Sequence, residues 1–208
     1  MDEDEAVAWL AANVSRETSE KLERFIVLLK AANVAQNLVA AASISQIHAR
    51  HIVDSAQLAH LEPNAMHWVD LGSGAGLPGI VIAIVTGKPM ILIEQRRLRV
   101  AFLEHVVAEL GLSNARVEAA AVERVHGIRA DAIVARAFAP LDRLFSLALP
   151  LAHASTIWVL PKGRRAKEEL ASLVGKWHVD ARMEQSLTDR DSQIIVAHGV
   201  RRWGRAAR

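Results

Sequence analysis

The residues with the clearest chemical potential lie in segment 69–79, which reads VDLGSGAGLPG. Gly72, Gly74 and Gly76 allow the backbone to turn sharply and to approach a ligand closely, because glycine has no side chain and adopts positive φ easily. Aliphatic residues before the turn predict a strand. Those after it predict a helix whose first turn tolerates Pro78, since no amide is needed there. A strand, a glycine turn and a helix in this order predict a ligand-binding crevice at the carboxyl end of a parallel sheet.

Two carboxylates lie near this turn, and one of them, Asp70, helps to distinguish between cofactors. Segment 74–79 matches the G-x-G-x-x-G pattern of dinucleotide-binding proteins, in which the helix N-terminus receives a pyrophosphate. Asp70 lies two residues before Gly72, and its negative charge disfavours a pyrophosphate but suits the ammonium and sulfonium of S-adenosylmethionine. Glu94, 22 residues after Gly72, ends the next predicted strand, where a carboxylate accepts hydrogen bonds from the ribose of either cofactor. We favour S-adenosylmethionine; the alternatives are a nicotinamide dinucleotide and a turn without a ligand, in which Asp70 caps the helix.

The residue inventory narrows what such a methyl donor can modify. The chain has no Cys, the usual nucleophile for methylation at pyrimidine C5. Segment 136–140, after the fourth predicted strand, reads RAFAP and lacks the acid and paired prolines typical of enzymes that methylate exocyclic base amines. Guanine N7 has a free lone pair and no proton, so its alkylation requires no general base. We therefore expect no catalytic acid or base, and we expect Arg136 and Phe138 to position the reactants.

Basic residues near the same rim suggest a polyanionic partner. Lys162, Arg164 and Arg165 follow the fifth predicted strand, where they are candidates for contacts to RNA phosphates; a solvated helix start is the alternative. His51, on a predicted helix, is a further candidate for the rim and for RNA contact. Because His48 and His51 have no third ligand nearby in the sequence, we predict no metal site.

From residue 66 onward, short aliphatic runs alternate with helix-length segments. Strands are predicted at 67–71, 90–93, 116–118, 132–135 and 156–160, and helices at 78–86, 97–110, 121–125, 141–151 and 166–174. Five such units predict an α/β fold with a parallel sheet covered on both faces. Two further strands, 177–185 and 192–200, have no convincing helix between them and are expected to finish the sheet as an antiparallel hairpin.

The first third of the chain is predicted to be helical. Segments 3–12, 19–38 and 45–60 show helical periodicity, with Ser45 as a candidate N-cap for the third, which ends before Glu62-Pro63-Asn64. No Gly/Ser-rich linker follows. We therefore predict one compact unit, in which a helical N-terminal cap, 1–62, packs on a main domain, 63–208.

Length and composition are those of a globular protein, with 208 residues, 51% hydrophobic and 23% charged. Residues 1–24 contain seven acidic and three basic side chains, a net charge of −4, so the rest carries +6 within the total of +2. An acidic N-terminal segment followed by a basic remainder of the chain is compatible with a polyanionic partner. The first five residues are too acidic for a signal peptide, and the longest aliphatic run, 80–85, is too short to cross a membrane. We expect a cytoplasmic protein with no membrane partner, and a monomer.

Several motifs together resemble a known family. Besides the glycine turn they are RVAFL at 99–103, LGLSN at 110–114, VE at 122–123 and RAFAPL at 136–141, with further similarity in 37–38, 50–55 and 162–163. The combination resembles the bacterial ribosomal RNA small-subunit methyltransferase G family, also called the glucose-inhibited division protein B family. The resemblance implies a Rossmann-like class I S-adenosylmethionine-dependent methyltransferase with a mostly parallel seven-stranded sheet and an antiparallel last strand. It also implies methylation of N7 of a guanine in 16S ribosomal RNA, either free or in the small ribosomal subunit.

Carried over residue by residue, the resemblance implies cofactor contacts by Gly72, Leu77, Val122, Glu123 and Arg136. The complete set of cofactor-binding residues that we predict adds Asp70, Gly74, Gly76 and Glu94. Two other functions remain open at this point. One is an NAD-dependent oxidoreductase, and the other is a non-catalytic RNA-binding module that keeps the pocket only as structure.

Overall fold

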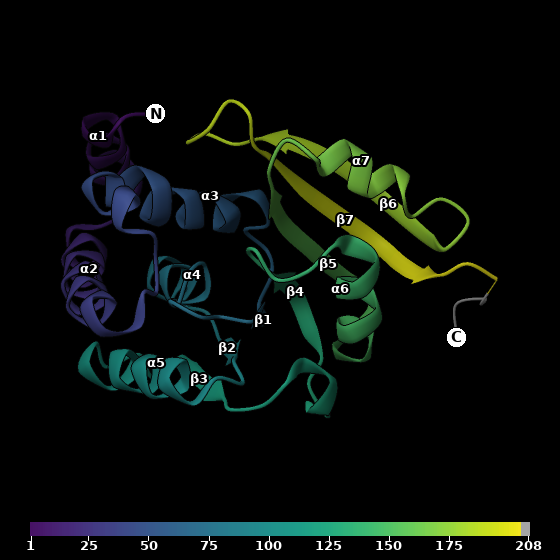
Figure 1. The fold of residues 1–208 in the computed structure, drawn as a ribbon, viewed down its shortest axis with the longest axis horizontal. Coiled ribbons are helices and arrows are strands. Elements are labelled where there is room, and N and C mark those ends of the chain that lie inside the picture. Colours follow the sequence, from purple (N-terminus) through teal and green to yellow (C-terminus); the bar gives the residue numbers. More distant parts are fainter. Residues whose placement is uncertain (205–208) are drawn as a thin grey trace.

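A seven-stranded sheet forms the centre of the computed structural model, which describes residues 1–204 (Figure 1). The last four residues of the predicted main domain, 205–208, lie outside this range. The strand order is β3-β2-β1-β4-β5-β7-β6. The strands are β1 (Trp68–Leu71), β2 (Met90–Ile93), β3 (Ala115–Glu118), β4 (Ala130–Val134), β5 (Ala152–Lys162), β6 (Trp177–Gln185) and β7 (Gln193–Arg202).

The pairing of these strands confirms the predicted fold class. Strands β1 to β5 are parallel, whereas β7 runs antiparallel between β5 and β6. The chain winds outward from β1 through β2 to β3 and then crosses back to β4, on the other side of β1. The direction of winding reverses there, so a crevice opens at the carboxyl end of β1. The glycine turn therefore lies at the switch point of the sheet.

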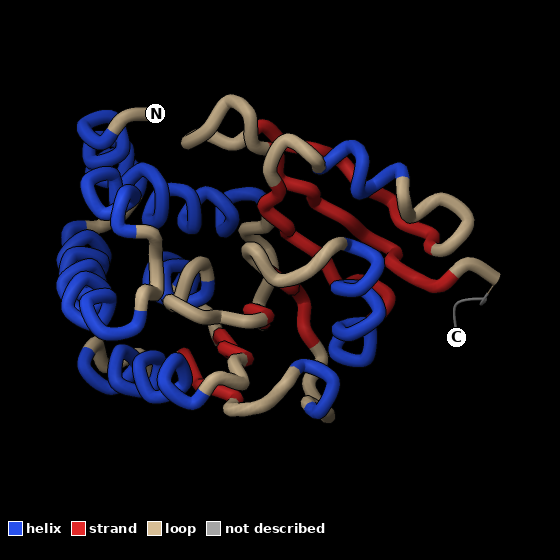
Figure 2. Tube along the Cα trace, viewed as in Figure 1, coloured by secondary structure: helices blue, strands red, loops and turns tan. Residues whose placement is uncertain are grey.

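Helices cover both faces of the sheet (Figure 2). One core contains buried side chains of α4 (Gly79–Thr86) and α5 (Arg97–Glu109), and the other contains those of α6 (Leu141–Ala148) together with Ala166 at the start of α7 (Ala166–Ala171). Trp158 on β5 and Trp177 on β6 flank Phe145 edge-on in the second core. The predicted helix over 121–125 is only a single 3-10 turn, η3 (Val122–Arg124), because Val125 is already extended. A second 3-10 turn, η4 (Leu149–Leu151), precedes β5.

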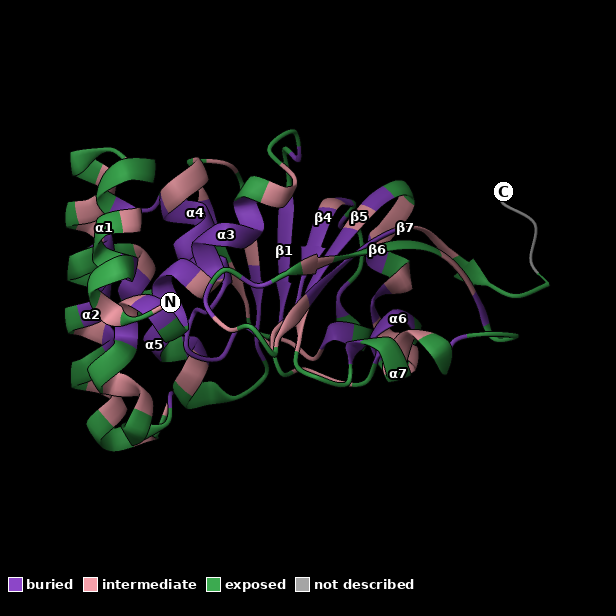
Figure 3. Cartoon of the chain, turned by 90° about the horizontal axis from the view of Figure 1, so that it is seen from above, coloured by how far each residue is buried: buried purple, intermediate pink, exposed green. Residues whose placement is uncertain are grey.

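The N-terminal third is helical, as predicted, with α1 (Glu3–Asn13), α2 (Arg16–Gln36) and α3 (Asp54–Leu61). The outer faces of α1 and α2 are exposed, whereas five consecutive residues of α3, 55–59, are buried (Figure 3). All three helices share the first core with α4. Leu29 of α2 and Ile80 of α4 are both fully buried in that core. No helix among residues 1–204 has both the length and the apolar character needed to cross a membrane.

The segment before α3 departs from the predicted regular helix over 45–60. The chain forms a 3-10 helix, η1 (Ala41–Gln46), and then a π-helix, η2 (His48–Val53). The prediction of Ser45 as an N-cap was wrong, because Ser45 lies inside η1. The amides of His48 and Ala49, at the start of η2, instead donate to the carboxylate of Glu3 on α1, each at 3.0 Å. A residue from another helix thus caps the π-helix, which local sequence cannot reveal.

Candidate active site

The glycine turn joins β1 to α4 with three residues in the left-handed region. Gly72, Gly74 and Gly76 have φ of +66°, +54° and +78°. A Cβ on residue 72 would also lie 2.7 Å from Cδ2 of Phe138. Glycine at position 72 is therefore required both by the backbone conformation and by the close approach of an aromatic ring.

Asp70 is buried beneath this turn, with 1% of its surface exposed. Its Oδ2 accepts a hydrogen bond from the amide of Gly79 at 3.1 Å, so it caps the start of α4. Its Oδ1 has no partner among the described residues. Burial raises the pKa of the Asp70 carboxyl to about 7, and the hydrogen bond from the amide of Gly79 only partly offsets this effect.

Glu94 connects the end of β2 to the glycine turn. Its Oε2 accepts from the amide of Gly74 at 3.0 Å, and its Oε1 accepts from the amides of Gln95 and Arg96, each at 2.8 Å. The carboxylate is buried. Because each carboxylate oxygen has two acceptor sites, Glu94 retains capacity for a ligand hydroxyl.

A cavity of about 280 Å³ lies beside these residues, and we call it the glycine-turn pocket. Polar groups at its wall include Glu94 and Glu123, and apolar ones include Ile93, Val122 and Leu147. The backbone of Gly72 forms part of the same wall. A carboxylate beside an apolar slot fits a ribose joined to a flat base.

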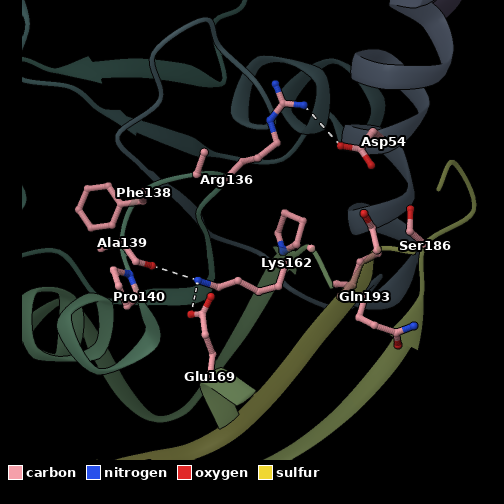
Figure 4. A pocket seen from close by; sticks show the side chains of 14 residues that line it. Asp54, Arg136, Phe138, Ala139, Pro140, Lys162, Glu169, Ser186 and Gln193 are labelled. Atoms are coloured by element: carbon pink, nitrogen blue, oxygen red, sulfur yellow. Dashed lines mark hydrogen bonds and ion pairs between the residues drawn. The ribbon is translucent and has the colours of Figure 1, made fainter. Parts of the chain in front are cut away.

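A larger cavity of about 510 Å³ lies at the end of β5, and we call it the β5 pocket (Figure 4). It is lined mainly by the segment after β4, by the ends of β5 and β7 and by Asp54 of α3. Residues 137–139 belong to the walls of both pockets. The two cavities therefore adjoin at Phe138, and Ala137 before it has a φ of +51°, which orients this segment.

Arg136 lines the β5 pocket, and its guanidinium contacts residues of η2 and Asp54 of α3 (Figure 4). Its Nη1 lies 3.3 Å from Nδ1 of His51, 3.4 Å from Oδ2 of Asp54 and 3.5 Å from the carbonyl oxygen of Arg50. Nε and Nη2 of Arg136 have no protein partner within the described chain. These nitrogens remain available to an anionic or carbonyl group in the pocket.

Lys162 supports the segment that separates the pockets. Its Nζ donates to the carbonyl of Ala139 at 3.0 Å and to Oε2 of Glu169 at 2.9 Å. The same Oε2 accepts from the amide of Leu141 at 3.1 Å. The Lys162 side chain is only 12% exposed, so its charge is committed to the protein rather than displayed toward an external phosphate. The sequence predicts an RNA contact for Lys162, and the structure pairs its Nζ with groups of the protein instead.

The predicted RNA-binding residue His51 is also poorly placed for such a contact. Only 9% of its surface is exposed, and both ring nitrogens have partners, Ser43 at 2.8 Å and Arg136 at 3.3 Å. Arg164 and Arg165 are exposed and pair with Asp191 and Glu168. Their predicted contact to RNA is geometrically open, although neither lines a pocket.

The predicted cofactor-binding residues separate into three groups. Gly72, Glu94, Val122 and Glu123 line the glycine-turn pocket, and Arg136 lines the β5 pocket. Asp70, Gly74, Gly76 and Leu77 line neither. The sequence analysis did not nominate Asp54 or Glu169 as site residues, although Asp54 lies inside the RHIVDS segment that carries the family resemblance. No cluster of metal-ligating side chains occurs within residues 1–204.

The structure distinguishes between the two cofactors considered for the turn. A pyrophosphate at the N-terminus of α4 would compete with the Asp70 carboxylate, which already accepts the first amide of that helix. S-adenosylmethionine requires no anion site there. The backbone of Gly72 and the carboxylate of Glu94, both at the glycine-turn pocket, fit the nucleoside of S-adenosylmethionine.

Known proteins similar in sequence to this chain are methyltransferases. A family model described as rRNA small subunit methyltransferase G matches residues 18–195. A relative named Ribosomal RNA small subunit methyltransferase G, from Sphingopyxis alaskensis, is 48% identical over 202 residues, which cover 95% of this chain and 87% of the relative. One of the same name from Zymomonas mobilis is 43% identical, with coverage of 95% and 94%.

Solved structures share the fold at low sequence identity. A precorrin-6y C5,15-methyltransferase from Geobacter metallireducens matches with a TM-score of 0.51 at 11% identity, covering 79% of this chain and 91% of that one. A mutant of MtNAS in complex with S-adenosylmethionine matches with a TM-score of 0.59 at 14% identity, covering 96% and 84%. At this identity the likeness concerns the architecture alone.

Proposed function

The chain belongs to the rRNA small subunit methyltransferase G family, and from this membership we propose that it transfers the methyl group of S-adenosylmethionine to N7 of a guanine in 16S ribosomal RNA. The observation that carries the proposal is the pair of adjoining pockets that share residues 137–139, in a chain that matches the family model over 18–195. One pocket suits the nucleoside of the donor, and the other has room for a base. An oxidoreductase is not favoured, because the anion site at α4 is taken by Asp70.

On the donor side, we assign the nucleoside to the glycine-turn pocket. Glu94 accepts the ribose hydroxyls, and Ile93, Val122 and Leu147 provide apolar contact for the adenine. Glu123 lies at the same wall. S-adenosylmethionine, when bound, supplies a methyl group on a positively charged sulfur, which needs no further activation. Asp70, Gly74, Gly76 and Leu77 act by shaping the turn, and Arg136 receives the carboxylate of the amino-acid portion.

On the acceptor side, we assign the guanine to the β5 pocket. Phe138 lies at the junction and offers an aromatic face, and stacking of a base on such a ring contributes about 1–3 kcal/mol. Guanine N7 has a free lone pair and no proton, so methyl transfer to it from the sulfonium, with S-adenosylhomocysteine as the leaving group, would require no proton removal by the protein. Catalysis then depends on alignment and on exclusion of water, and orientation alone supplies up to roughly 7–11 kcal/mol.

We place the RNA backbone outside the β5 pocket, near Arg164 and Arg165. Both guanidinium groups are exposed, and exposed ion pairs contribute little, so exchange of Asp191 or Glu168 for a phosphate costs little. We further propose that the enzyme acts as a monomer in the cytoplasm. In this proposal residues 1–62 form a cap that belongs to one unit with 63–208.

The direct test uses purified protein, S-adenosylmethionine labelled in its methyl group and small ribosomal subunits that lack the modification. Nucleoside mass spectrometry of the recovered 16S rRNA should show labelled 7-methylguanosine, and borohydride with aniline cleavage should map it to one position. Reactions without protein, or with unlabelled donor, serve as controls. Label in another nucleoside would refute the N7 assignment. Binding of donor and RNA without any label in RNA would identify a non-catalytic binding module.

A further inference from the structure

The π-helix η2 and the first residue of α3 place three hydrogen-bond acceptors around one guanidinium nitrogen. The carbonyl oxygen of Arg50, Nδ1 of His51 and Oδ2 of Asp54 all lie within 3.5 Å of Nη1 of Arg136. π-helical turns are rare and are concentrated at functional sites. Here the turn places a buried imidazole directly against the arginine that faces the β5 pocket.

The chemistry of the neighbours determines the protonation state of this imidazole. A guanidinium only donates, so Nδ1 of His51 must accept from Arg136 and carries no proton. On the other side of the ring, Nε2 lies 2.8 Å from Oγ of Ser43, and this hydroxyl lies 2.7 Å from the carbonyl of Ala40. A carbonyl only accepts, so the Ser43 proton points to Ala40 and Oγ accepts from Nε2–H. The chain of donors therefore runs from Arg136 through His51 and Ser43 to Ala40.

The charges around His51 agree with a neutral ring. Arg136 and Arg50 contribute positive charge beside the ring. The carboxylate of Asp54 on α3 lies 3.4 Å from Nη1 of Arg136, and that of Glu3 on α1 accepts from the amides of His48 and Ala49. Burial, followed by the two guanidinium groups, lowers the pKa of His51 to about 4, against a smaller opposing effect of Glu3. The ring is thus uncharged at neutral pH.

We propose that His51 is a positioning residue that, as the neutral Nε2–H tautomer, holds the guanidinium of Arg136 so that Nε and Nη2 point to the reactants. The inference rests on the proposed function for the role of Arg136, but its observables are the tautomer and the binding constants, not methylation of a particular base. It replaces the RNA contact that sequence analysis expected of His51. The residue acts through Arg136 and touches neither reactant.

Two amide variants separate this role from simple packing. His51→Asn keeps an acceptor at the place of Nδ1 and loses the donor to Ser43. His51→Gln keeps a donor at the place of Nε2 and loses the acceptor for Arg136. If His51 positions Arg136, His51→Gln should weaken S-adenosylhomocysteine binding or raise KM for ribosomal subunits at least fivefold. The affected constant should be the one that Arg136→Gln alters, and His51→Asn should stay within twofold of the wild type.

The tautomer itself is measured on the unaltered full-length protein. In 15N-histidine-labelled protein at pH 7, long-range proton–nitrogen correlation should show Nδ1 of His51 unprotonated and Nε2 protonated, with the signals assigned from their loss in His51→Asn. An Nδ1–H tautomer or an imidazolium at pH 7 would overturn the proposal. Equal effects of the Asn and Gln variants, or no effect of either, would overturn it as well. Absence of rRNA methylation would count against the proposed function, and the tautomer and the affinity for S-adenosylhomocysteine would still test the role of His51.

Discussion

The ring of Phe138 lies so close to Gly72 that a single added carbon at position 72 would come within 2.7 Å of Cδ2. This contact links the first strand of the sheet to the segment after the fourth. It makes the glycine a structural partner of the aromatic ring as well as a wall of the glycine-turn pocket.

Gly72→Ala should therefore damage the site more than an ordinary glycine substitution. The strain of an alanine at φ +66° costs about 1–3 kcal/mol of unfolding free energy, and displacement of Phe138 adds to it. Gly111→Ala is a matched control, because residue 111 has a φ of +58° and no atom within 4 Å of an added Cβ. Denaturant unfolding and calorimetric titration with S-adenosylhomocysteine should show the larger loss for Gly72→Ala, at least tenfold in affinity. Equal losses in both variants would show that the contact with Phe138 is unimportant.

Lys162→Met should destabilise the protein and reduce kcat/KM. It leaves the Glu169 carboxylate and the Ala139 carbonyl without their donor, at a cost of about 1–3 kcal/mol. Arg165→Met is the control: its side chain is 83% exposed in its pair with Glu168, and the expected cost is below about 1 kcal/mol. Urea unfolding of both variants checks the difference. A Lys162→Met protein as stable as the Arg165→Met protein would contradict the supporting role of Lys162.

Arg164→Gln and Arg165→Gln should weaken RNA binding in a salt-dependent manner. If each guanidinium contacts a phosphate, each substitution reduces the slope of log affinity against log salt concentration by about 0.7–0.9. Cofactor affinity should be unchanged, since neither residue lines a pocket. Filter binding of 16S rRNA fragments between low and moderate salt measures the slope. An unaltered slope in both variants would place the RNA elsewhere.

Asp70→Asn should change the pH dependence of stability. The folded-state pKa of about 7 lies above the ordinary value of 3.8, so the native protein binds more protons than the unfolded chain between these values. The unfolding free energy of the wild type should therefore fall, relative to Asp70→Asn, as pH rises from about 4 to 7. The amide oxygen of Asn still accepts from Gly79, whereas Asp70→Ala loses this cap. Thermal unfolding at several pH values measures the trend, and parallel curves for wild type and Asn would argue against a raised pKa.

The sequence predicts the bounds of a strand well where a run of strand-forming residues begins and ends clearly. The strands Met90–Ile93 and Trp177–Gln185 have the predicted bounds. Strand β5 is longer than predicted, because Ala152 pairs with Ala130 of β4 across a register shift and Lys162 pairs with Gln193 of β7. Hydrophobic periodicity also could not distinguish a 3-10 turn followed by a π-helix from one regular helix over 45–60.

The site was predicted best where a residue acts through its backbone or its place at a strand end. Gly72, Glu94 and Val122 lie at the expected pocket for that reason. The roles of Lys162 and His51 depend on partners brought together by tertiary packing, Glu169 and Arg136. No pattern of residue types reports that a basic side chain is buried and hydrogen-bonded within the protein, so the sequence predicts RNA contacts for both.

The carboxylate of Glu3 has a consequence for how variants of α1 should be interpreted. It accepts hydrogen bonds from the first two amides of η2, although Glu3 lies 45 positions before His48 in the chain. The next residue of η2, Arg50, contacts Arg136 through its carbonyl oxygen. Helix α1 is thereby connected, through η2, to Arg136 at the β5 pocket. A substitution in α1 that loosens the contacts of Glu3 should therefore shift the guanidinium of Arg136. Such a variant should have altered turnover even when its melting temperature is normal.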